Sequence, residues 1–166
     1  MTASAYCTTA TALLLFGAIP SLRAQDHSHA SEPTAPSPVS VPLDEATLAA
    51  LPRTPVVATA HGKTLNCAGV RLSALLTHAG VLSAEPLRGP ALADYVLVTA
   101  RDGYRAVYSL GELEPTLGNN DVVLVNRCDD QPLSDDSGPL RLIAPEESRP
   151  ARWVRQVQSI TVVAAP

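Results

Sequence analysis

Positively charged residues are scarce in this sequence of 166 residues. Lysine occurs once, and the 12 Lys and Arg residues are outnumbered by 16 Asp and Glu residues, which gives a formal net charge of −4. Proteins that hold nucleic acids or anionic membranes need clustered basic side chains to neutralise phosphate groups. The composition therefore argues against both classes of partner.

Long apolar runs are also missing. A membrane-spanning helix needs about 20 consecutive apolar residues, whereas the longest apolar run here covers only residues 10–19. This run is followed by Pro20 and by a small residue at Ala24, a pattern typical of a secretory signal peptide. We predict cleavage before Gln25. The remaining 142 residues carry a net charge of −5, since Arg23 is removed from the total of −4, and the mature chain is expected to be periplasmic or secreted.

The sequence contains no phosphate-binding glycine loop and no Ser-His-Asp pattern that would indicate a hydrolase. Two histidines, His61 and His78, are isolated and are interpreted as surface or packing residues. The predicted mature N-terminus places His27 third and His29 fifth. A free amine with a histidine at the third position binds Cu(II) or Ni(II) in a square-planar arrangement, so these two residues are metal-ligand candidates. The alternative is that they are incidental histidines in a solvated segment.

Proline, serine and alanine dominate residues 25–53. Such a composition buries too little apolar surface to offset the entropy lost on ordering, so this segment is predicted to be a disordered tether. Within it, residues 44–51 are compatible with one or two helical turns. The packed domain is expected to cover residues 54–166 as a single unit.

In the packed region, short β-rich runs outnumber helical patterns. Residues 101–103 (Arg-Asp-Gly) separate two β-rich runs and predict a hairpin. Leu72, Leu75 and Leu76 share one face of a predicted helix over residues 71–79, and Ser109 with Glu112 can form a capping box for a second, short helix. Strands are predicted at residues 56–59, 95–100, 104–108, 121–127, 138–144 and 157–163. The sequence therefore predicts an α+β domain with a mainly β core of mixed strands and a few short helices.

Only Cys67 and Cys128 remain after removal of the leader. Two cysteines in an exported chain are candidates for a disulfide. The alternative is a pair of buried thiols that pack as small apolar side chains. The spacing alone does not decide between them.

Motifs spread over the last hundred residues resemble the molybdopterin-binding domain of the sulfite oxidase family. They are GVRLSALLTHAG (69–80), DGY (102–104), YSL (108–110), QPL (131–133), GPLRLIAP (138–145) and RW (152–153). The resemblance covers residues 54–164 and implies the fold of that domain, here as a small exported stand-alone version. In family enzymes the molybdenum is held by the pterin dithiolene and by one cysteine, often in a Cys-Ala-Gly segment.

The segment Cys67-Ala-Gly69 invites comparison with this metal ligand. In the family, however, the cysteine lies a few tens of residues before the leucine-rich segment that begins here at Gly69, and a long ordered region precedes it. This chain has neither the gap nor that region. We therefore expect a cofactor-free or degenerate binding or accessory module, with Cys67 as a buried structural residue before a turn at Gly69. The alternative is a molybdopterin-dependent oxidoreductase in which Cys67 or a partner chain completes the metal site.

Four residues correspond to positions near the family's cofactor. Arg141 and Arg152 match basic residues close to the pterin phosphate, which a guanidinium can bind through two parallel hydrogen bonds. Ser137 stands where the family often has a histidine, and Asp102 matches an acidic residue near the site. The resemblance implies a cofactor-binding role for these four residues. The alternative for Arg141 and Arg152 is pairing with surface carboxylates.

Overall fold

A computed structural model describes residues 38–165 of the chain. Its elements in chain order are β1 (Val39–Val41), α1 (Glu45–Ala50), β2 (Arg53–Ala60), β3 (Lys63–Arg71), α2 (Leu72–His78), the 3-10 helix η1 (Gly89–Ala93), β4 (Tyr95–Ala100), β5 (Arg105–Ser109), α3 (Leu110–Leu113), β6 (Val123–Cys128), β7 (Gln131–Pro132), β8 (Arg141–Ile143), the 3-10 helix η2 (Pro150–Arg152) and β9 (Val157–Val163). None of the helices in this part of the chain is long and apolar enough to cross a membrane.

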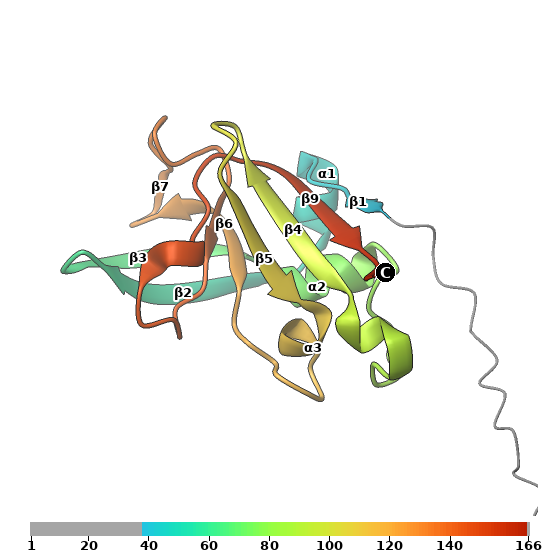
Figure 1. Cartoon of the computed structure of the whole chain (residues 1–166). Helices are drawn as coiled ribbons and strands as arrows, with labels where there is room; N and C mark the ends of the chain where they lie inside the picture. Colours follow the sequence, from blue (N-terminus) through green and yellow to red (C-terminus); the bar gives the residue numbers. More distant parts are fainter. Residues whose placement is uncertain (1–37, 166) are drawn as a thin grey trace, which may run out of the picture. The chain divides into compact units, whose positions relative to one another are not determined.

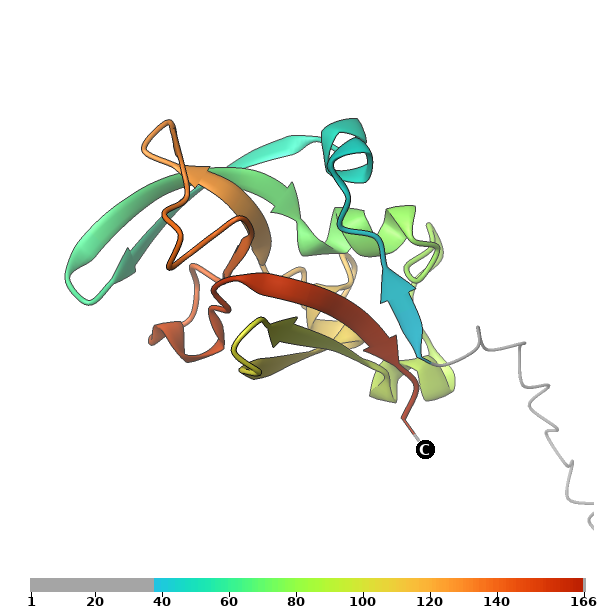
Figure 2. The ribbon, with the colours of Figure 1, turned by 90° about the horizontal axis from the view of Figure 1, so that it is seen from above.

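The strands form two antiparallel sheets (Figures 1 and 2). One has the order β1-β9-β4-β5, and the other has the order β2-β3-β6-β7 with β8 also paired to β6. The domain is therefore mixed helix and strand with a mainly β core, as the sequence predicted. The chain crosses repeatedly between the sheets, so residues distant in sequence meet at the loops.

Local sequence signals explain several of these elements. The hairpin predicted around Arg101-Asp-Gly103 is present as β4 and β5, and Gly103 takes the positive φ of 85° that the turn requires. The capping box is also present, because the Ser109 side chain accepts from the Glu112 N–H and Glu112 accepts from the Ser109 N–H. The helix predicted over residues 71–79 is α2.

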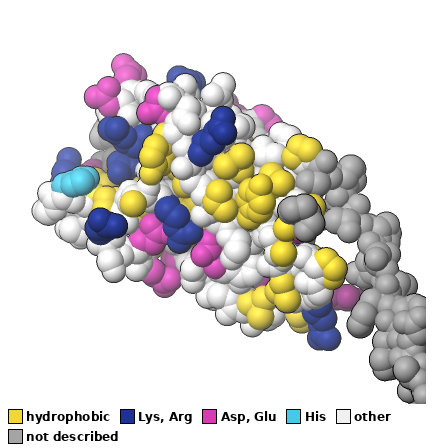
Figure 3. Space-filling model, in the orientation of Figure 1, with side chains coloured by type: hydrophobic (Ala, Val, Ile, Leu, Met, Phe, Trp, Pro, Cys, Tyr) yellow, Lys and Arg dark blue, Asp and Glu magenta, His cyan; other side chains and the backbone are white. Residues whose placement is uncertain are grey.

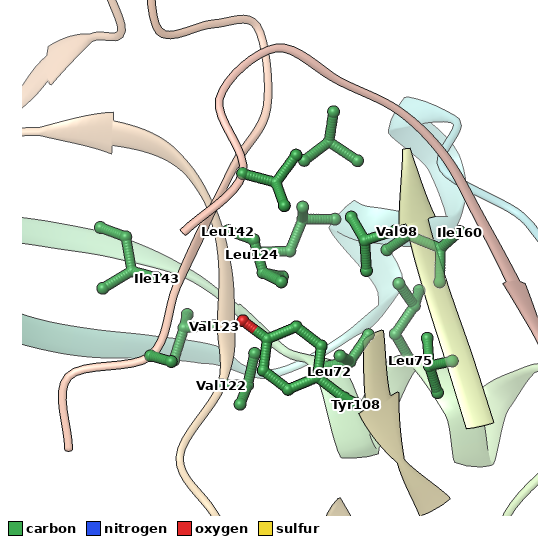
Figure 4. Close-up of a cluster of buried hydrophobic side chains, with 14 of the residues drawn as sticks. Leu72, Leu75, Val98, Tyr108, Val122, Val123, Leu124, Leu142, Ile143 and Ile160 are labelled. Atoms are coloured by element: carbon green, nitrogen blue, oxygen red, sulfur yellow. The ribbon is translucent and has the colours of Figure 1, made fainter. Parts of the chain in front are cut away.

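The hydrophobic core lies between the two sheets and is closed by α2. Figure 4 shows Leu72 and Leu75 of this helix beside Val98, Leu124 and Ile160 from three strands. All five side chains are at most 1% exposed. Alternation along the strands supplies this face, since buried and exposed residues follow one another with a period of two.

Two expectations about the start of the domain were wrong. Residues 38–53 are not a tether, because β1 pairs with β9, with Val41 opposite Ile160, and α1 follows. The packed region therefore begins before Thr54. Residues 25–37 and the predicted leader lie outside the described residues.

The expected turn at Gly69 is also absent, because β3 continues through Gly69 to Arg71 and α2 follows immediately. Cys67 is thus in the middle of a strand and not at the entry to the helix. Strand β7, which pairs with the end of β6, was not predicted either.

Candidate functional site

Tight turns between strands border two adjoining clefts. Non-glycine residues with positive φ occur in three of the bordering segments: His61 (φ 51°) between β2 and β3, Asp129 (φ 48°) between β6 and β7, and Gln156 (φ 48°) before β9. Backbone conformations of this kind are concentrated at functional sites, because the surrounding structure must hold them in place. The turns therefore mark this region for closer description.

The first cleft, called cleft A, has a volume of about 420 Å³. Its lining comes from hairpin turns, from β8 and from the η2 region: His61, Ala100, Asp102, Tyr104, Ser137, Arg141, Pro150, Ala151, Trp153 and Arg155. Two arginines and two aromatic side chains thus face one space. This combination suits a ligand that carries negative charge.

The second cleft, called cleft B, has a volume of about 500 Å³. It is lined by Ala60, His61, Lys63, Leu65, Cys128, Asp129, Pro132, Leu133, Ser134, Ser137 and Arg141. Leu65, Cys128 and Leu133 are partly buried and pack against the hydrophobic core, so they form an apolar wall. Clefts A and B share His61, Ser137 and Arg141, which therefore form their junction.

Arg141 brings an unsatisfied hydrogen-bond donor to this junction. Its Nε is buried and has no hydrogen-bond partner. The guanidinium carbon lies 5.8 Å from the centroid of the Trp153 ring, and that ring is fixed by an Nε1–H hydrogen bond of 2.9 Å to the Ala144 carbonyl. Buried donors are almost always paired in folded proteins. Arg141 thus lines both clefts with a guanidinium whose Nε–H is unsatisfied within residues 38–165.

Arg155 adds a second positive charge to cleft A. The pKa of Arg141 is lowered, first by burial and then by the charge of Arg155. Among residues 38–165, neither arginine forms a salt bridge. Figure 3 shows Lys and Arg side chains gathered around a histidine toward the end of the molecule where the β2–β3 hairpin lies. An anion would relieve the repulsion between the two guanidinium groups.

The backbone next to Arg155 is held by three hydrogen bonds of Gln156. Its N–H donates to the Ser137 carbonyl at 3.0 Å, its side-chain amide donates to the Asp135 carbonyl at 2.7 Å, and its carbonyl accepts from the Arg101 N–H at 3.0 Å. These contacts tie the segment to two loops from different parts of the chain. Arg155 has no local sequence signal as a site residue, because only this non-local pairing brings it into the same lining as Arg141.

Arg152 lies outside both cleft linings. Its guanidinium forms salt bridges to Glu112 at 3.0 Å and to Glu147 at 2.6 Å, and it stacks 4.3 Å from the centroid of the Tyr108 ring. Burial lowers its pKa, but the hydrogen bond and charge of Glu112 and the charge of Glu147 outweigh this, so the pKa is raised. Arg152 therefore pairs with surface carboxylates, which was the alternative expected for both arginines. Arg141 forms no such pair within residues 38–165.

The other two residues implied by the resemblance both line cleft A. Ser137 is at the junction, and its backbone N–H donates to the Ser134 carbonyl at 2.9 Å. Asp102 is in the β4–β5 turn, where its carboxylate accepts from the Tyr104 N–H at 2.9 Å. The structure thus brings together Asp102, Ser137 and Arg141, but not Arg152.

Cys67 and Cys128 form a disulfide between β3 and β6. The two residues are directly opposite each other in the antiparallel register. Beside them, β3 and β6 approach so closely that a Cβ at Gly69 would lie 2.1 Å from the Leu124 carbonyl oxygen. Both conspicuous residues of the Cys-Ala-Gly segment therefore have a role in strand packing.

The two histidines of residues 38–165 do not form a metal site. His61 lines both clefts, and His78 is exposed in the last turn of α2. Residues 38–165 contain no group of three His, Cys, Asp or Glu side chains placed to hold a metal ion. The candidate ligands His27 and His29 lie outside the described residues.

Most of the chain matches one known protein family. Residues 36–166 match the family described as the oxidoreductase molybdopterin binding domain. The chain belongs to this family. No match is found among curated proteins.

A molybdopterin-binding domain must accommodate both the anionic end and the metal end of its cofactor. Arg141 fits the anionic end, because it lines both clefts without a salt bridge in the described residues and charge-assisted hydrogen bonds to phosphate are strong. No residue within 38–165 fits the metal end, because the ligand would have to be a thiolate and both cysteines of this part of the chain, Cys67 and Cys128, are joined in a disulfide. Within residues 38–165 this molybdopterin-binding domain thus offers a cation for the anionic end and no free thiolate for the metal end.

Proposed function

We propose that this chain is an exported, molybdenum-free member of the family that works as a binding or accessory module for a small molecule. The observation that carries the proposal is the Cys67–Cys128 disulfide, because it leaves no free thiol on the one cysteine that the sequence offers as a metal-ligand candidate. The pairing of Arg152 with Glu112 and Glu147 supports it, since that arginine is engaged within the protein. Clefts A and B then serve as the binding site.

Export is supported by two independent features. The N-terminal sequence has the pattern of a cleavable leader. Disulfides persist in oxidising compartments such as the periplasm or the extracellular space. We expect the mature protein to begin at Gln25, which N-terminal sequencing of protein from the exported fraction would check.

Metal and pterin analysis tests the absence of the cofactor. The protein is purified without reductant from the compartment in which it accumulates, and molybdenum and pterin are measured per chain. We expect both to be far below stoichiometric. Near-stoichiometric molybdenum and pterin would overturn the proposal.

A second candidate is a molybdopterin-dependent oxidoreductase in which Cys67 or a partner chain completes the metal site. The place of Arg141 in both cleft linings favours it, because this residue corresponds to the family's phosphate contact. Cys128→Ser tests the version with Cys67 as metal ligand, since it frees the Cys67 thiol while leaving the clefts' arginines in place; the version with a partner chain is tested by the metal analysis of native protein above. If the protein is an oxidoreductase of this kind, this variant or the reduced parent should retain molybdenum when it is expressed with the cofactor pathway. If it is a binding module, neither protein should retain molybdenum.

A further inference from the structure

We propose that clefts A and B together bind a small amphiphilic organic anion. Its anionic group lies between Arg141 and Arg155, and its apolar part lies along the wall of cleft B. The inference rests on the proposed function, because it requires clefts that no molybdenum cofactor fills.

The anionic group is placed by two unneutralised guanidinium groups. Arg141 lines both clefts, Arg155 is exposed and lines cleft A, and neither forms a salt bridge within residues 38–165. An oxyanion such as a carboxylate or a phosphate monoester presents several acceptor oxygens to such donors. Ser137 lies at the junction of the clefts, so the anion has a route into either space.

The two acidic residues in the linings form no salt bridge with these arginines within residues 38–165. The Asp102 carboxylate accepts from the Tyr104 N–H at 2.9 Å. The Asp129 carboxylate accepts from the Asn66 side-chain amide at 3.1 Å. Each carboxylate is held by its own turn or by the neighbouring strand. The two linings together contain three cationic side chains (Lys63, Arg141 and Arg155) and these two carboxylates, so positive charge is in excess.

The apolar part is placed by the wall of cleft B. Leu65, Leu133 and Cys128 each bury part of their side chains against the core and leave the rest facing the cleft. Ala60 and Pro132 extend the same wall. An inorganic anion would leave this surface in contact with water, whereas an alkyl chain would cover it. Each buried methylene group strengthens binding about fourfold.

Calorimetric titration of the mature chain, produced without molybdenum, tests the inference. The probes are inorganic phosphate, hexyl phosphate, hexanoate and the uncharged hexanol. We expect hexyl phosphate and hexanoate to bind at least tenfold more tightly than inorganic phosphate, and hexanol to bind far more weakly than either. The two hexyl anions distinguish a phosphate from a carboxylate as the preferred head group.

Variants assign the two halves of the site. Arg155→Met changes an exposed residue, so the variant is expected to fold, and it should weaken both hexyl anions at least tenfold. Leu133→Asn should weaken them while sparing inorganic phosphate. Arg88→Met, an exposed arginine outside both linings, is the matched control and should bind like the parent.

The inference is overturned if hexyl phosphate binds no more tightly than inorganic phosphate, because the site would then take any small anion. It is equally overturned if Arg155→Met binds like the parent. Failure of the proposed function is seen separately, as molybdenum in the native protein, and does not depend on these titrations.

Discussion

Removal of the Cys67–Cys128 disulfide should lower the free energy of unfolding by about 4 kcal/mol. The cysteines are 61 residues apart, and the chain-entropy model assigns roughly this value to a loop of that size. The folded state should change little, because the Asp129 N–H still donates to the Asn66 carbonyl at 2.7 Å and holds the strand pair beside the missing bond. The loss therefore arises mainly in the unfolded chain.

The measurement compares the parent with the double variant Cys67→Ala/Cys128→Ala by urea unfolding and by thermal melting. For a domain of about 130 residues, 4 kcal/mol corresponds to a decrease in Tm of about 15 °C. Dithiothreitol should bring the parent close to the double variant and should leave the double variant unchanged. If the double variant unfolds within about 1 kcal/mol of the parent, the reasoning from loop closure is refuted.

Three further predictions concern single residues. Gly69→Ala should lower the free energy of unfolding by more than about 2 kcal/mol, because its Cβ would collide with the Leu124 carbonyl. Gly111→Ala is the control and should be neutral, because the atoms nearest to its Cβ would be 4.0 Å away. Equal melting temperatures for the two variants would contradict this account. Arg152→Met should lower the free energy of unfolding by about 1–2 kcal/mol, measured in urea, since two partly exposed ion pairs and a stacking contact are lost. The variant should bind hexyl phosphate like the parent. Loss of that binding would instead make Arg152 a ligand residue. Burial, and then the charge of Glu147, raise the pKa of Tyr108 above its ordinary 10.0. Above about pH 10 the folded state therefore keeps a proton that the unfolded chain releases, and the free energy of unfolding should fall by up to about 1.4 kcal/mol per pH unit. Tyr108→Phe should remove this part of the decrease in urea unfolding measured from pH 9 to 11, and an unchanged slope would argue against this account.

The strands and helices that were predicted correctly have signals within a few residues. The run 157–163 is rich in β-branched side chains and is β9 in full. The Ser109–Glu112 capping box needs only four residues to form. Strand β3 was missed because Cys-Ala-Gly at 67–69 has low strand propensity, and only the partner strand β6 explains why a glycine is needed there.

The candidate site was predictable only in part for the same reason. Arg141 was found because it belongs to a recognisable segment, and the structure adds that its Nε–H is unpaired. Arg152 belongs to an equally recognisable segment, but Glu112 and Glu147 come from other parts of the chain, and no local pattern shows their pairing. Arg155 depends on the left-handed conformation of Gln156, which sequence propensity does not indicate. The roles implied for Ser137 and Asp102 stay predictions.

The order of strands in the first sheet has a consequence for the timing of folding. Strand β9, the last in the described chain, lies between β1, the first, and β4. This sheet cannot close until residues 157–163 have been synthesised, because β1 pairs only with β9 within the described residues. Pairing between such distant segments is slow to form. The second sheet, in contrast, uses only strands that precede β9, so we expect the two sheets to complete their pairing at different stages of synthesis.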